Sequence, residues 1–444
     1  MTDEIEDHVH DQNGAHMTVD VAVVGGGLAG LAAAATAARG GCRVVVLEAH
    51  LAGGRARSVE RNGYTLNQGA HALYLGGAAG AVLDQLGVVT TGGEPPADEY
   101  RTFWNGRVVP LPLTPKGLLT TRLLGVRSKA TAARLLGSIG SAARNAPDVP
   151  LEEWMEHERV RPDLARVLCV VARLTSYTAR PELAPAPAML RQLALGGGGA
   201  RYVDGGWQTI VDGLLAAARR AGARVVTGAP VTELARDRHG RDGHWMVRAG
   251  NRTVAARSVV IATGGPAHAE ALAGRGPGWT ETAGVPVRAA CLDVGLGGLV
   301  GSPPVRYLFS ADDPLYLSQH APVARVAPDG HDLYQLLRYL GSDEHLSPAQ
   351  ARAELEQHAA RAGLPPTGER TVERFLADMT VAWGSHQVGV LRPRGDELAA
   401  HGIHVAGDWV GDHLLADAAL DSGARAGRAA GVAAATGAAV RMGA

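Results

Sequence analysis

A short, almost wholly apolar run marks the first regular structure that the pattern predicts. Residues 19–24 contain four valines and an alanine and lead directly into a glycine turn. Such a run is too short for a buried helix and predicts a strand that is buried on both faces, as in a parallel sheet. An alanine-rich helix over 28–39 and a second apolar strand over 42–47 follow. Together these elements predict one βαβ unit of ordinary length.

The same kind of pattern returns after residue 204. The elements that we expect are a helix over 207–221, strands over 224–227 and 231–234, a hairpin over 245–248 and 252–255, a buried strand over 259–263, a short strand over 403–407 and a helix over 416–437. Two interruptions separate them, one helical at 100–204 and one strand-bearing at 285–375.

This arrangement indicates an α/β protein with two domains, one of them inserted into the other. We expect a discontinuous nucleotide-binding domain with a Rossmann fold and an α+β substrate-binding domain. The predicted bounds are 19–100, 205–284 and 376–444 for the first domain and 101–204 and 285–375 for the second. Residues 1–18 are acidic and contain His8 and His10; we expect a flexible, solvated tail there, with a metal site as the alternative.

Composition removes several classes of function. Basic and acidic residues number 43 and 44 in a chain of 444, so a general nucleic-acid binder is not expected. The three cysteines, Cys42, Cys169 and Cys291, lie far apart and odd in number, which argues against a disulfide framework and against an iron–sulfur or cysteine zinc site. This cysteine usage fits a reducing cytoplasm, and we expect no metal site. Because the sequence has no run of 18 apolar residues and no secretory leader pattern, we expect no transmembrane helix and no secretory signal.

The first glycine turn carries a dinucleotide-binding pattern. Residues 25–30 read G-x-G-x-x-G: Gly25 permits the tight turn, Gly27 lets the backbone approach a diphosphate, and Gly30 lets helix and strand pack closely. The diphosphate would rest at the helix N-terminus, beside Leu28 and Ala29, where free N–H groups favour anions. Glu48 ends the second strand and has the carboxylate expected to accept hydrogen bonds from ribose hydroxyls. The turn alone fits either FAD or NAD.

The residues that follow favour FAD. Gly53-Gly54-Arg55 offers N–H groups and a guanidinium to the same diphosphate. Beside this motif stand the stretch 63–71, which ends Gly69-Ala70-His71, and the closing segments 405–409 and 417–423. With these motifs the chain resembles the flavin amine oxidase superfamily, including phytoene desaturases and protoporphyrinogen oxidases, over nearly its whole length from Val19. The resemblance implies a two-domain FAD-binding fold of the glutathione-reductase type.

The resemblance also assigns expected contacts to this chain. It places residues 63–71 under the flavin ring, the backbone of Val231 against adenine, and Asp408, after Gly407, on the ribityl or diphosphate part. The N–H groups around Ala418, Ala419 and Leu420, beside Asp417, would face the flavin N1/O2 edge, where a helix dipole stabilises negative charge. Three positions depart from the family pattern: Glu48 and Gly53 are one residue closer than usual, Asn67 replaces an acid, and Asp417 replaces a glutamate.

The substrate side is less defined. Lys116 and Lys129 are the only lysines, so the lysine that many amine oxidases of this superfamily use to hold a water at flavin N5 is absent, and no cysteine after Cys291 could link the flavin covalently. Both absences favour a desaturase-like enzyme with non-covalent FAD. The candidate active-site residues are His71, Tyr316, His320, Trp383 and His386. Tyr316, Ser318 and His320 alternate along one strand face, which lines either the substrate cavity or the solvent.

Residues 107–144 contain seven cations, no acid and several interleaved leucines. Such a stretch fits contact with an anionic membrane or entry of an apolar substrate. The alternative, which we favour from sequence, is a set of packed helices with a solvated basic face.

The expected function is FAD-dependent oxidation of a small organic substrate that is largely apolar or conjugated, with hydride passing to flavin N5 and electrons leaving to oxygen or a quinone. A peroxide-forming amine or amino-acid oxidase is the first alternative. A non-enzymatic escort protein of the same fold is the second, and the intact nucleotide motifs argue against it.

Overall fold

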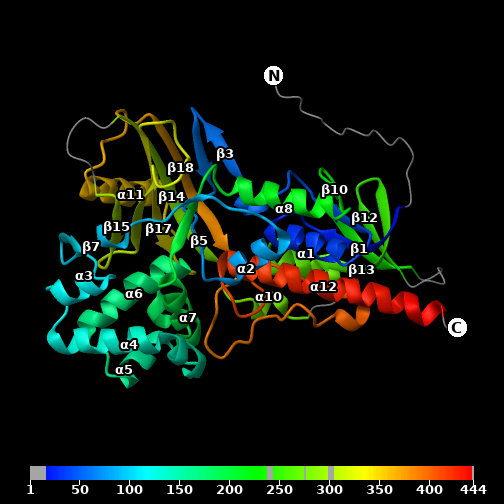
Figure 1. Cartoon of the computed structure of the whole chain (residues 1–444), viewed down its shortest axis with the longest axis horizontal. Coiled ribbons are helices and arrows are strands. Elements are labelled where there is room, and N and C mark those ends of the chain that lie inside the picture. Colours follow the sequence, from blue (N-terminus) through cyan, green and yellow to red (C-terminus); the bar gives the residue numbers. More distant parts are fainter. Residues whose placement is uncertain (1–16, 238–243, 275–276, 299–304, 443–444) are drawn as a thin grey trace.

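The computed structural model describes residues 17–237, 244–274, 277–298 and 305–442. Of the predicted tail 1–18, residues 1–16 lie outside the described residues, and Met17 and Thr18 already belong to the first strand. Two bodies lie side by side (Figure 1): a nucleotide-binding half around α1, α8 and α12, and a half formed by a second sheet with helices α3–α7 beside it.

A mostly parallel sheet forms the centre of the nucleotide-binding half. Its order is β10-β2-β1-β13-β12-β11, with β19 also paired to β13. The bounds are β1 Met17–Val24, β2 Val44–Leu47, β10 Arg224–Val226, β11 Val231–Arg236, β12 Trp245–Ala249, β13 Arg252–Ile261 and β19 Ile403–Val405. The apolar runs predicted as doubly buried strands are β1, β2 and the second half of β13, and helices on both faces explain their lack of alternation.

One predicted division in this sheet is wrong. The second hairpin strand and the buried strand expected over 259–263 are a single strand, β13. Its first half pairs antiparallel with β12 and its second half pairs parallel with β19, while β1 lies along its other edge throughout. The burial pattern along β13 changes from alternating to continuous where its neighbour changes from β12 to β19.

Helix α12 (Leu415–Met442) packs against α1 (Leu28–Arg39) at very short range. Gly423 and Gly427 face the α1 backbone, where an added Cβ would overlap the carbonyl oxygens of Ala29 and Ala33. Small residues on both helices therefore permit the contact. The other helices of this half are α2 Ala78–Leu86, α8 Gln208–Arg220, α9 Pro266–Ala273 and α10 Trp279–Thr282.

The second sheet has the order β18-β14-β17-β16-β15-β7-β8. The bounds are β7 Tyr100–Trp104, β8 Arg107–Pro110, β14 Val287–Gly297, β15 Tyr307–Ser310, β16 Leu315–Ala321, β17 His331–Leu340 and β18 Val372–Ala382. Alternate residues enter two different cores: Leu315 and Leu317 pack toward α11 (Pro348–Ala362), whereas Tyr316 faces the core shared with the helices. Both faces of this sheet are thus covered.

Two expectations about the insertions change. The first interruption was expected to be helical, yet it begins with β7 and β8, which extend the second sheet. The boundary expected at 375/376 falls inside β18, because that strand carries on pairing with β14 as far as Ala382.

The remaining helices of the first insertion are α3 Pro115–Thr120, α4 Val126–Asn145, α5 Leu151–His157, α6 Pro162–Ser176 and α7 Ala186–Gly196. Three small strand pairings complete the fold: β3 (Ser58–Arg61) with β4 (Tyr64–Asn67), β5 (Leu73–Tyr74) with β9 (Ala200–Val203), and β6 (Gly92–Gly93) with β9. Among the described residues, we find no helix with the length and hydropathy that crossing a membrane requires.

We predict that Gly427→Ala destabilises the protein by about 1–3 kcal/mol, because α1 and α12 would have to separate to accept the methyl group. Gly137→Ala in α4 is the matched control, since a Cβ there meets no atom within 4 Å and alanine favours a helix. Thermal unfolding of the two variants beside the parent protein measures the difference. Equal melting temperatures for both variants would contradict the close contact.

Candidate FAD-binding and active site

The turn between β1 and α1 is shaped by its glycines. Gly25 has φ +104°, and a Cβ on it would overlap the carbonyl oxygen of Ala262. A Cβ on Gly30 would overlap the carbonyl oxygen of Gly25, so this glycine permits helix–strand packing. A Cβ on Gly27 meets no protein atom within 4 Å and would project into open space. Gly27 is thus the glycine whose small size matters to a ligand rather than to the fold.

The Gly53-Gly54-Arg55 turn lies directly against this first turn. Gly27 and Gly53 form an isolated parallel bridge, and the Gly53 N–H donates to the Gly26 carbonyl oxygen at 2.7 Å. Glu48 holds the same turn from the second strand, where its Oε2 accepts from the Gly26 N–H at 2.6 Å and its Oε1 accepts from the His50 N–H at 2.8 Å. The three nucleotide motifs found in the sequence therefore form one rim.

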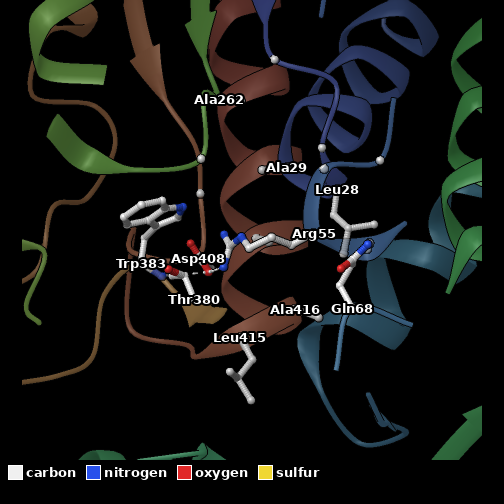
Figure 2. Close-up of a pocket in the computed structure, with 18 of the residues that line it drawn as sticks. Leu28, Ala29, Arg55, Gln68, Ala262, Thr380, Trp383, Asp408, Leu415 and Ala416 are labelled. Carbon is white, nitrogen blue, oxygen red and sulfur yellow. Dashed lines mark hydrogen bonds and ion pairs between the residues drawn. The ribbon is translucent and has the colours of Figure 1, made fainter. Parts of the chain in front are cut away.

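Arg55 and Asp408 meet across this rim although they are 353 positions apart. Arg55 Nη1 donates to Asp408 Oδ2 at 2.7 Å and also to the Val381 carbonyl oxygen at 2.9 Å (Figure 2). The Trp383 N–H donates to the same Asp408 Oδ2 at 3.1 Å. The other carboxylate oxygen, Oδ1, is buried and has no hydrogen-bond partner among the described residues. It is therefore free to accept a hydrogen bond from a bound group.

A cavity of about 510 Å³ runs along these motifs. Besides Asp408 Oδ1, the buried Thr263 Oγ1 and Trp207 Nε1 belong to residues that line it and lack partners within the described chain. Unsatisfied donors and acceptors around a cavity, together with the open space at Gly27, are what a large polar ligand would complete. The residues present thus fit a dinucleotide such as FAD.

Most of the predicted cofactor residues line this cavity. Those that do are Gly25, Gly27, Leu28, Ala29, Glu48, Gly54, Arg55, Ala70, Val231, Gly407, Asp408, Asp417 and Ala419. Four others, Gly30, Gly69, Ala418 and Leu420, are packed just behind its wall and are not among the lining residues.

Asp417 has a structural partner of its own. Its Oδ1 accepts a hydrogen bond from the Ala79 N–H at 2.6 Å and so satisfies the first turn of α2. Burial is the main influence on this carboxyl group and raises its pKa above the ordinary value. The helix begins at Leu415, so the expected donors at Ala418, Ala419 and Leu420 lie after its first residues, and the Ala418 N–H already donates to the Leu414 carbonyl oxygen at 3.2 Å. The N–H groups of α12 that precede Ala418 are the ones available to a ligand.

His71 is one of two predicted catalytic candidates that line the cavity. Its Nδ1 lies 2.8 Å from the Gly69 carbonyl oxygen, and its ring packs 4.7 Å from that of Trp207. Because the carbonyl oxygen can only accept, Nδ1 carries the proton and Nε2 is the free acceptor. Burial lowers the pKa of His71 to about 4, so the ring is neutral at neutral pH.

Trp383 also lines the cavity, and its indole packs over Gly265. Tyr316, His320 and His386 do not. His386 instead accepts from Arg392 at 3.2 Å, and Arg392 also donates to the carbonyl oxygens of Asp408 and His413, each at 2.6 Å. Burial first, and then Arg392, lowers the pKa of His386 to about 2. Arg392 and His386 therefore support the loop that carries Asp408.

The polar face of β16 is buried, which makes the solvent-facing alternative wrong. Tyr316, Ser318 and His320 do share one face, and this face packs within the protein. The His320 ring stacks on Tyr202 at 3.9 Å, and the Tyr202 hydroxyl lies 2.5 Å from Ser318 Oγ. Burial lowers the pKa of His320 to about 3. These residues form a second layer behind the residues that line the cavity.

Several cavity residues were not predicted from the sequence, among them Tyr177, Met379 and Leu415. Tyr177 ends α6 with φ +60°, and its hydroxyl donates to the Ala70 carbonyl oxygen at 2.9 Å. Leu415 has φ +56° at the start of α12. In sequence they read as ordinary core residues, and only the meeting of α6, β18 and α12 brings them together. Among the described residues, no group of three or more metal-ligating side chains is found.

The fold and this site define an FAD-dependent oxidoreductase. Residues 28–278, more than half of the chain, match the family described as flavin containing amine oxidoreductase, and the chain belongs to that family. The expected resemblance and the expected two-domain FAD-binding fold are confirmed.

A Mycobacterium tuberculosis protein named as a flavin-containing monoamine oxidase, AofH, is 31% identical over 248 residues, which are 50% of this chain and 52% of AofH. The matching part thus spans about half the length of this curated relative.

Solved structures share the fold over nearly the whole chain. An oxidoreductase from Methanosarcina mazei has a TM-score of 0.69 at 19% identity and covers 91% of this chain and 99% of its own. Cyclohexylamine oxidase from Brevibacterium oxydans IH-35A has a TM-score of 0.67 at 19% identity, covering 94% and 99%. A structure from Exiguobacterium sp. 255-15, described as a protoporphyrinogen oxidase, has a TM-score of 0.68 at 16% identity, covering 94% and 99%. At these identities the likeness concerns the fold.

We predict that Gly27→Val abolishes FAD retention while the protein stays folded. The added Cβ meets no protein atom within 4 Å and enters the space that a diphosphate needs. The ratio of flavin to protein absorbance after gel filtration measures retention, and circular dichroism reports the fold. A folded variant that keeps its flavin with unchanged affinity would refute the assignment of the turn.

We also predict that His320→Phe, which keeps the stack on Tyr202, becomes relatively more stable than the parent protein as pH falls. His320 has a folded-state pKa of about 3 against an ordinary histidine pKa of 6.5, so the unfolded chain binds the extra proton and the parent loses stability between these limits. The expected divergence is up to ~1.4 kcal/mol per pH unit. Melting curves at several pH values between 7 and 4 test it, and parallel curves would show that His320 titrates normally.

Proposed function

We propose that the cavity holds FAD without a covalent bond. Arg55 and the turn around Gly27 would bind the diphosphate, Glu48 the adenosine ribose, Val231 the adenine, and Asp408 Oδ1 a ribityl hydroxyl. None of the three cysteines is among the cavity-lining residues, which supports non-covalent binding. When bound, FAD supplies a hydride acceptor at N5 of its ring.

The distribution of charge around the cavity carries the proposal about substrate. Its acidic and arginine side chains, Glu48, Arg55, Asp408 and Asp417, all have partners within the chain. Glu48 holds a turn, Arg55 and Asp408 pair with each other, and Asp417 caps α2. Glu48, Arg55 and Asp408 would be occupied by FAD, and Asp417 caps α2, so no arginine would be left for a carboxylate substrate and no carboxylate for an ammonium substrate.

The rest of the lining contains no acidic, arginine or lysine side chain and is largely apolar. It includes Ala70, Tyr74, Tyr177, Met379 and Leu415. A neutral, apolar or conjugated organic substrate fits such walls, because its burial needs no counter-ion. The protein would then contribute orientation of the reacting C–H bond and exclusion of water.

The proposed reaction is dehydrogenation of this substrate, with hydride leaving to the cofactor. His71 is the candidate to accept a proton, because it lines the cavity and its Nε2 is left free when Nδ1 donates to the Gly69 carbonyl oxygen. Neither lysine is among the lining residues, so a lysine-held water plays no part. Tyr316, His320 and His386 lie behind the wall, and we assign them no contact with substrate.

Electrons would leave to oxygen or a quinone, and NAD(P)H would not be the donor. The sequence contains a single G-x-G-x-x-G turn between a strand and a helix, and FAD would occupy it. A cytoplasmic location is part of the proposal and rests on cysteine usage alone.

Amine oxidation is the second candidate function. Its support is the relative named as a monoamine oxidase and the structure of cyclohexylamine oxidase. Against it stands the lack of an unpaired carboxylate among the described residues of the cavity, although an amine that enters unprotonated would need none.

We predict that purified protein is yellow, that acid releases intact FAD, and that a neutral conjugated substrate bleaches the flavin anaerobically. Primary amines, NADH and NADPH under the same conditions should not. Stopped-flow loss of flavin absorbance compares the three groups, with Gly27→Val as the flavin-free control. Bleaching by amines alone would establish the second candidate, and rapid bleaching by a nicotinamide nucleotide would show a reductase.

A further inference from the structure

One corner of the substrate-binding half combines exposed apolar and cationic side chains. It is formed by α3, the following loop and the first turn of α4, at the end of the molecule away from α1 and α12 (Figure 1). We define the α3–α4 corner as Lys116, Leu119, Arg122, Val126 and Arg127.

The apolar members of the corner are not explained by core packing. Leu119 is 75% exposed and Val126 is 85% exposed. Their neighbours Leu118, Leu123 and Leu124 already supply the contacts with the core. Apolar side chains are also exposed singly elsewhere, as Val89 is, but Leu119 and Val126 lie close to Lys116, Arg122 and Arg127 in the sequence. This exposure favours membrane contact over packed helices with a solvated basic face as the interpretation of residues 107–144.

The cations of the corner are not neutralised by the protein. Lys116, Arg122 and Arg127 form no ion pair within the described residues, and residues 107–144 contain no acid. Asp163 is an acidic residue that contacts the start of α4. Its carboxylate accepts hydrogen bonds from the Gly125 N–H at 3.0 Å and from Ser128 Oγ at 2.7 Å, and among the described residues it forms no ion pair with the corner's cations. The corner thus keeps its positive charge although the chain as a whole has a net charge of −1.

Acidic residues border the α3–α4 corner on one side. Farther along α4, Arg134 approaches Glu158 at 3.9 Å, and α5 presents Glu152, Glu153 and Glu156 in the next segment. Lys129 donates to the Leu119 carbonyl oxygen at 2.7 Å, which fixes α3 against α4. A small, rigid corner with outward apolar tips is therefore bounded by acidic residues on one side.

We propose that the α3–α4 corner docks on an anionic lipid bilayer. Leu119 and Val126 enter the headgroup region, while Lys116, Arg122 and Arg127 contact anionic headgroups. Apolar tips and cations each give weak binding, and together they supply the two signals that reversible membrane attachment needs. The proposal does not depend on the substrate, because it concerns a surface outside the cavity.

Vesicle sedimentation of the holoprotein tests the proposal. We expect binding to phosphatidylcholine vesicles with about 30% phosphatidylglycerol and none to pure phosphatidylcholine, because the cations need an anionic surface. The double variant L119E/V126E should bind at least ~tenfold more weakly. The double variant R122E/R127E should weaken binding by a similar factor. The flavin spectrum of each variant reports that the fold is intact.

Two controls make the same chemical changes elsewhere. Val432→Glu places a charge on an apolar position of α12 that is 67% exposed, and R219E/R220E reverses two exposed arginines of α8. Both should bind vesicles like the parent protein. Binding that survives L119E/V126E, or that all charge reversals weaken equally, would overturn the proposal and indicate attraction to any polyanion.

Acylation of Lys116 provides a measurement that needs no variant. Lys116 is exposed at the corner, so an amine-acylating reagent should modify it in solution. Anionic vesicles should slow its acylation several-fold, as mass spectrometry of the corresponding peptide would show. An unchanged rate at a vesicle concentration that sediments the protein would mean that another surface binds.

Discussion

The close approach of α1 and α12 is the contact on which the site depends. Gly423 and Gly427 let the two helix backbones meet, and this contact fixes the start of α12 beside the first glycine turn. Asp408 and Leu415 reach the cavity only because the chain returns from the second domain to this position. A bulkier residue at either glycine would separate the two ends of the nucleotide site before it affected any ligand contact.

Internal pairing of charge defines what the cavity can accept. Arg55 and Asp408 are opposite charges in a partly enclosed site, and their ion pair leaves a single carboxylate oxygen free. Glu48 and Asp417 hold backbone N–H groups of the protein itself. Burying an ionic substrate beside groups that are already satisfied would leave its charge uncompensated. The proposal of a neutral substrate rests on this arrangement.

Behind the cavity, β16 supplies support rather than contact, whereas β18 of the same sheet reaches the cavity wall with Met379, Thr380 and Val381. Tyr202 stacks on His320, and Tyr177 donates to the Ala70 carbonyl oxygen, so the wall that carries His71 is held by buried aromatic side chains. Arg392 does the same for the loop of Asp408. Neutral histidines suit this layer, because a charged ring would be costly so far from water.

The sequence alone determined the first βαβ unit and the glycine turns of the nucleotide half. Its strands and helices follow from local apolar patterns, and the roles of Gly25, Gly27 and Gly30 follow from backbone geometry that any such turn needs. Three features could not be predicted: the continuity of β13, the pairing of Arg55 with Asp408, and the positions of Tyr177, Met379 and Leu415. Each depends on contacts between segments far apart in the chain. Alternation placed Tyr316, Ser318 and His320 on one face, but only the packing of the helices on that sheet decided that the face is buried and lies behind the cavity.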